Sequence, residues 1–133
     1  MMYIINLIIG DWAHEGHGKS SIVTIRSTLS KSEIDNAYLE GSKKLGFSFI
    51  EEVGVEFGGC LLTQERLDAL DEAGVDTSCV TNYGTEGYYI DDEDSFVELY
   101  LSIVNLGDDT FEWERVGHEE NHIRIGGYGI FGD

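Results

Sequence analysis

The sequence of 133 residues lacks proline altogether and contains only two cysteines. Linkers between domains are commonly rich in proline and serine, and no such segment occurs here. Cys60 and Cys79 lie in unlike contexts without partners at metal-binding spacing, which favours two half-buried thiols in a reducing, intracellular environment. A single disulfide between them is the alternative.

Long hydrophobic runs are also missing from the sequence. The apolar run Met1–Ile9 is too short to span a membrane and has no basic segment before it. It ends at Gly10-Asp11 rather than at a small-residue cleavage site. The sequence therefore predicts neither a membrane span nor a signal peptide.

Basic residues are scarce, since 8 Lys and Arg face 26 Asp and Glu and give a formal net charge of −18. Residues 1–50 hold five acidic and five basic residues, so this segment is neutral. Residues 51–133 hold 21 acidic residues and only three basic ones, Arg66, Arg115 and Arg124. A field of this sign repels nucleic acids and anionic membranes and attracts basic surfaces, so we expect a basic partner and no direct binding to nucleic acid or membrane.

The sequence does contain the apolar residues of a folded domain. Hydrophobic residues make up 41% of the chain and include seven Tyr, six Phe and two Trp, more than a disordered acidic tail carries. A chain of this length normally forms one core, and no internal repeat divides it. We therefore expect a single domain spanning residues 1–133.

Residue patterns predict a mixture of strands and helices without a regular alternation. Apolar or alternating segments indicate strands at residues 3–9, 22–26, 87–90, 111–116 and 122–125. Capping and spacing signals indicate helices at residues 30–46, 64–73 and 92–107. The predicted fold class is α+β, a compact domain with a mainly antiparallel sheet of about four to six strands packed with about three helices.

Carboxylates cluster in the second half of the chain. As a strand, residues 111–116 would place Glu112 and Glu114 on one face and Phe111 and Trp113 on the other. A rigid acidic face could imitate part of duplex DNA, which carries about one charge per 1.7 Å of axis. The predicted partner-binding residues are Asp91, Asp92, Glu93, Asp94, Asp108, Asp109, Glu112, Glu114, Glu119 and Glu120, with Trp12 and Trp113 as aromatic anchors.

Simpler explanations compete with this interpretation. An acidic surface also serves solubility or adaptation to high salt. The neutral first third of the chain argues against salt adaptation, which would spread acidic residues over the whole surface. Trp12 has a simpler explanation as well, as a side chain that covers the edge of the core.

The glycine-rich segment at residues 10–21 fits a phosphate-binding loop only in its loosest form, with Gly18-Lys19-Ser20 at its end. Such a loop must lead directly into a helix whose amides hold the phosphates. The residues after Ser20 are β-branched and typical of a strand. The sequence therefore argues against nucleotide hydrolysis.

The same segment carries Asp11, His14 and His17, which together could bind zinc or another divalent metal, with His118 and His122 as further ligands. Hydrogen-bonding turn residues are the ordinary alternative for histidines in a polar loop. No Ser-His-Asp or Cys-His arrangement marks a catalytic nucleophile. We therefore expect a binding protein without a cofactor rather than an enzyme.

Small size, strong acidity, the lack of catalytic motifs and a compact α+β layout resemble the phage-encoded inhibitors of bacterial defence, in particular anti-CRISPR proteins that mimic nucleic acids. The segment with Gly10-Asp11-Trp12 and Gly16-His17-Gly18 is similar to that of small phage and gut-bacterial proteins. The resemblance is one of type rather than of motif, so it assigns no functional residue. It implies an inhibitor in the cytoplasm of a bacterial host cell that covers the nucleic-acid channel of a basic protein such as a Cas nuclease.

Two further functions stay open at this point. One is a metal-binding module or metal-dependent hydrolase that uses residues 10–21. The other is a protein that sequesters a small nucleotide signal in the same segment, where Lys19 and backbone amides could meet phosphate. The overall negative charge opposes an anionic ligand, and the oligomeric state is open.

Overall fold

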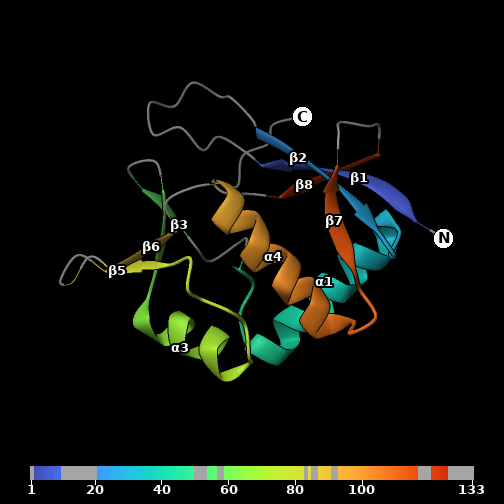
Figure 1. Ribbon diagram of the computed structural model, residues 1–133. Coiled ribbons are helices and arrows are strands. Elements are labelled where there is room, and N and C mark those ends of the chain that lie inside the picture. The colour runs from blue at the N-terminus through green and yellow to red at the C-terminus, as the bar shows by residue number, and fades with distance from the viewer. Residues whose placement is uncertain are drawn as a thin grey trace.

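Two four-stranded sheets lie on different sides of a central helix, α4, in the computed structural model (Figure 1). The structure describes residues 2–9, 21–49, 54–56, 59–82, 84, 87–90, 93–116 and 121–125. Within these residues three helices and eight strands form a compact α+β arrangement, which confirms the predicted fold class. No helix in this part of the chain has the length and hydropathy needed to cross a membrane.

The first sheet contains the two longest strands, β1 (Tyr3–Ile9) and β2 (Ser21–Ser27), which pair antiparallel along their whole length. The edge strand β7 (Trp113–Val116) pairs antiparallel with β2. On the other side β8 (Asn121–Ile125) pairs parallel with β1, which gives the order β7-β2-β1-β8. The apolar residues of β1 thus occupy a central strand, as their pattern predicts.

Both faces of the β1–β2 pair are covered. Ile5 and Leu7 are buried on the face that joins the hydrophobic core. On the opposite face Asn6 and Thr24 are also buried, and the Thr24 Oγ1 donates to Asn6 Oδ1 at 2.5 Å. This hydrogen bond compensates part of the cost of burying two polar side chains.

The second sheet consists of short strands in the order β3-β4-β6-β5, and all its pairings are antiparallel. The sequence patterns predict only one of these strands. The strand bounds are Gly54–Glu56 for β3, Gly59–Leu62 for β4, Thr81–Asn82 for β5 and Tyr88–Ile90 for β6.

Local signals fix the ends of the first two helices. α1 (Lys31–Leu45) begins with a complete capping box, in which Ser30 N donates to the Glu33 carboxylate at 2.8 Å and the Ser30 hydroxyl accepts from Glu33 N at 3.3 Å. It ends at Gly46, whose φ of 90° is the left-handed conformation that glycine tolerates best. α3 (Gln64–Glu72) begins at Thr63, whose hydroxyl accepts from Arg66 N at 3.2 Å.

The third helix, α4 (Glu93–Gly107), packs against α1 and against Phe49, which follows α1, through aromatic side chains. The rings of Tyr38 and Tyr100 stack with centroids 5.1 Å apart. Phe49 and Phe96 pack at 5.0 Å. The buried residues of both sheets join these helices in one hydrophobic cluster, so a single core supports the whole described structure.

Candidate partner-binding surface

The described part of the acidic cluster lies on α4 and on the segment that follows it. Residues 93–116 hold seven acidic residues and one basic residue, Arg115. The segment from Gln64 to Cys79 holds five acidic residues and one basic one, Arg66. α1, by contrast, holds three acidic and three basic residues and is neutral.

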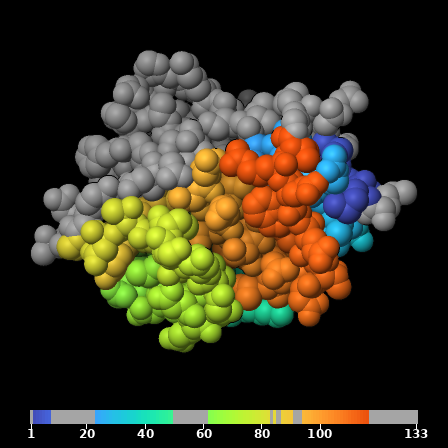
Figure 2. All heavy atoms as spheres, in the orientation of Figure 1, coloured from blue at the N-terminus to red at the C-terminus, as the bar shows by residue number. Residues whose placement is uncertain are grey.

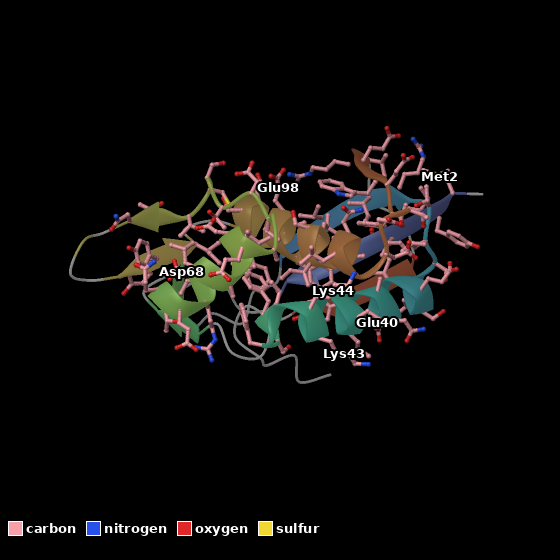
Figure 3. The ribbon with its side chains drawn as sticks, turned by 90° about the horizontal axis from the view of Figure 1, so that it is seen from below. Met2, Glu40, Lys43, Lys44, Asp68 and Glu98 are labelled. Carbon is pink, nitrogen blue, oxygen red and sulfur yellow. The ribbon has the colours of Figure 1, made fainter. Side chains whose placement is uncertain are left out.

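Glu98 of α4 and the paired charges of α1 lie on different sides of the molecule. Glu98 projects from α4 on one side, whereas Glu40 and Lys43 project from α1 on the opposite side (Figure 3). On α1 the exposed charges pair with one another, Lys43 with Glu40 at 2.9 Å and Lys31 with Asp35 at 3.5 Å. The negative charge of the described residues is therefore uneven, because α1 is neutral while α3, α4 and residues 108–116 carry the excess.

Two of the predicted binding residues already have basic partners. Arg115 Nη1 lies 2.8 Å from Asp94 Oδ1 and so ties β7 to the first turn of α4. Arg26 forms an ion pair with Glu114 across the β2–β7 pairing. All four side chains are exposed, and such pairs contribute at most about 1 kcal/mol each, so the two carboxylates are neutralised without being buried.

Asp108 has a local structural role after the end of α4. Its carboxylate accepts from Thr110 N at 3.0 Å and from the Thr110 hydroxyl at 2.5 Å. The side-chain and backbone hydrogen bonds of Thr110 hold the pKa of the Asp108 carboxyl below its usual range. Asp108 therefore shapes the turn that leads to Phe111, and Asp109 beside it is exposed.

The alternation predicted for residues 111–116 is confirmed for its central residues. Phe111 is buried and Trp113 is half-buried against the core, while Glu112 and Glu114 are exposed. The strand itself begins at Trp113 rather than at Phe111. Just before it, Thr28 anchors the backbone of Glu112, because Thr28 N donates to Glu112 O at 3.0 Å and Glu112 N donates to the Thr28 hydroxyl at 2.9 Å.

A groove of about 510 Å³ runs beside α4 and brings together three segments that are distant in the sequence. Ser102 and Asn105 of α4 contribute polar groups to it, and Leu101 and Leu106 contribute apolar ones. Residues 74–76 form one wall and residues 111–113 the other. Figure 2 shows these three surfaces side by side on one face, with α4 in orange between the lime and red-orange segments. We call this feature the α4 groove.

Asp76 is the acidic residue of the α4 groove that the sequence patterns miss. Its carboxylate accepts from Ser78 N at 2.9 Å, and hydrogen bonds from the Ser78 backbone and side chain hold its pKa below the usual range. Ser102 and Asn105 were missed as well. The signal for them is the polar stripe Asp94, Glu98, Ser102 and Asn105, which recurs at helical spacing through the otherwise apolar α4.

Several predicted site residues lie outside the described residues, namely Asp91, Asp92, Glu119, Glu120, Trp12, Asp11, His14, His17 and His118. Glu93 is the first residue of α4, and His122 occupies β8 opposite Asn6. Where the structure describes side chains, no group of three or more His, Cys, Asp or Glu is placed to hold a metal ion.

The thiol of Cys79 is free and half-buried. It lies 4.0 Å from the carbonyl oxygen of Ser95, and burial raises the pKa of the Cys79 thiol. Since the thiolate is the reactive form, the raised pKa lowers the reactivity of this thiol.

Comparison of the chain with models of known protein families, with curated proteins and with solved structures gave no match.

Proposed function

We propose that this protein inhibits a basic nucleic-acid-binding protein of a bacterial host cell by covering its nucleic-acid-binding surface. The observation that supports the proposal is the uneven distribution of charge. Acidic residues concentrate on α3, α4 and the segment before β7, whereas α1 is neutral. A charge kept only for solubility needs no such asymmetry.

Exposed carboxylates act on association more than on final affinity. Clustered charges of one sign steer a basic partner and raise its association rate, and salt screens this effect beyond a Debye length of about 8 Å at physiological ionic strength. Among the exposed carboxylates, Glu98, Asp109 and Glu112 have no ion pair with any residue that the structure describes. These three are therefore available to a partner.

Affinity capture from a bacterial lysate tests the proposal. The bait is the full chain at physiological salt, and bound proteins are eluted by raising the salt. The test variant is Glu98→Gln with Glu112→Gln. The control variant is Asp35→Asn with Glu40→Gln, which also removes two negative charges, but from α1.

We expect a nucleic-acid-binding protein that the unchanged chain and the α1 control both retain and that elutes with salt. The Glu98/Glu112 variant should retain clearly less of it. Equal retention by the two variants would contradict a role for the α4 side, and binding that resists salt would contradict recognition by charge.

A further inference from the structure

We infer that the α4 groove binds an arginine-bearing segment of the basic partner. This inference rests on the proposed function and names the contact that would make it specific. A uniform acidic surface attracts any cation, whereas a groove with fixed walls selects the shape of the group that enters it.

The groove has the size and rigidity of a binding site. Its volume of about 510 Å³ lies within the range of about 300–1,000 Å³ that is typical of ligand pockets. The wall of residues 111–113 is fixed to α4, because Asn105 Nδ2 donates to Phe111 O at 3.1 Å. The Thr28–Glu112 hydrogen bonds fix the same wall to the end of β2. A wall held from two directions does not have to be ordered when a ligand binds.

The opposite wall, formed by residues 74–76, is also held by hydrogen bonds. Val75 is buried, and its N–H donates to Leu70 O at 3.0 Å. The Thr77 hydroxyl donates to Asp71 Oδ1 at 2.5 Å, and Ser78 N holds Asp76. The Asp76 carboxylate therefore has a fixed position at the groove and carries its charge over a wide pH range.

The chemistry of the lining favours a guanidinium group. Each wall carries one carboxylate, Asp76 in the wall of residues 74–76 and Glu112 in the wall of residues 111–113. Neither carboxylate has an ion pair with a described residue. Trp113 also lines this wall and is only half-buried, on the opposite face of the extended segment from Glu112. One arginine side chain can stack on an indole ring and donate hydrogen bonds to one carboxylate at the same time, and a second arginine of the same segment can reach the other carboxylate. A lysine side chain offers a point charge and gains less from the aromatic ring.

The test uses the full chain and a capped octapeptide of alternating arginine and glycine, with a lysine–glycine octapeptide for comparison. Binding is followed at low salt by the shifts of backbone amide and indole signals in NMR spectra. The test variant is Asp76→Asn with Glu112→Gln, and its matched control is Glu40→Gln with Asp68→Asn, two exposed carboxylates that do not line the groove.

A second pair of variants tests the groove without changing Asp76 or Glu112, in case those substitutions disturb the fold. Ser102→Arg places a cation in the groove, whereas Asn36→Arg makes the same change on α1. Amide spectra without peptide show whether each variant is folded.

We expect the arginine peptide to shift the signals of Asp76, Ser102, Asn105, Glu112 and the Trp113 indole. Its dissociation constant should rise about fivefold to tenfold in the groove variants relative to their controls, and the lysine peptide should bind more weakly. If shifts spread evenly over all exposed acidic residues and both variant pairs behave alike, the groove inference is wrong while recognition by charge stands. If no peptide binds even at low salt, recognition by charge fails as well.

Discussion

Among single residues, several carboxylates of the acidic cluster make local contacts within the fold. Asp108 holds a turn through Thr110, Asp94 pairs with Arg115, and Glu114 pairs with Arg26. Each of these was expected to bind a partner because it belongs to the acidic cluster. Their local contacts divide the cluster into structural carboxylates and available ones such as Glu98 and Glu112.

Asp108→Asn should lower stability at neutral pH, because the amide is a weaker acceptor for the two Thr110 donors than the carboxylate. The folded-state pKa of Asp108 is lowered, so its contribution is present above about pH 4, the ordinary value for Asp. It is lost as the pH falls through the folded-state pKa.

Urea unfolding of the unchanged chain and the variant at several pH values measures this difference. The gap in unfolding free energy should be largest near neutral pH and should close in acid. A gap that persists unchanged into strong acid would show that the carboxylate charge is not its source.

Of the residues that line the α4 groove, some could be predicted from the sequence and others could not. Glu112 and Trp113 were predicted from alternation along one short segment, since neighbouring residues of an extended chain point to opposite faces. Asp76 was not, because only tertiary packing brings it to the groove beside residues 36 positions away. The Arg26–Glu114 pair depends in the same way on the β2–β7 register.

Among the elements, the three helices were predictable, whereas the short strands β3, β4 and β5 were not. The caps at Ser30, Thr63 and Gly46 act within four residues of the chain, so their signals are local. β4 finds its partner β6 about 30 residues further on, and β1 pairs with β8 across more than 100 residues. The unpredicted strands β3, β4 and β5 have two to four residues, and none of them shows an alternation of apolar and polar residues.

The α1–α4 crossing depends on two glycines. A Cβ atom on Gly107 would lie 1.7 Å from Ala37 O, and one on Gly41 would lie 2.1 Å from Ile103 O. Lys44 Nζ crosses to the carbonyl oxygen of Leu106 at 2.7 Å and supports the last turn of α4. The two backbones thus approach more closely than any side chain would allow.

Gly107→Ala should therefore lower the free energy of unfolding by about 3 kcal/mol or more, because the helices must separate and the core between them loses contacts. The matched control is Gly46→Ala, where an added Cβ meets nothing within 4 Å and only the φ of 90° is unfavourable. The control should cost about 1 kcal/mol. Equal costs in denaturant unfolding would contradict the close crossing.

At the scale of the whole molecule, the net charge of −18 opposes compactness. Raising the ionic strength from roughly 0.01 M to 1 M shortens the Debye length from about 30 Å to about 3 Å and screens the repulsion. The midpoint of thermal unfolding should rise by several degrees over this range, equally in sodium and potassium chloride. A midpoint that stays constant or falls with salt would show that repulsion in the folded state is minor.

The same imbalance connects the fold to the proposed function. One core carries both sheets, and the excess negative charge lies on α3, α4 and residues 108–116 while α1 is neutral. Rigid elements hold the available carboxylates apart, so a partner meets a fixed pattern of charge. This is the property that imitation of a nucleic acid requires.

Competition with DNA is the most direct test of whether the protein covers the nucleic-acid-binding surface of its partner. A labelled DNA duplex is bound to the captured partner at physiological salt, and the full chain is titrated into the complex. We expect the chain to displace the duplex, and we expect the Glu98→Gln, Glu112→Gln variant to need a higher concentration to do so. If the chain and the duplex bind the partner together without displacement, the acidic side does not occupy the nucleic-acid site and the proposed mode of inhibition is wrong.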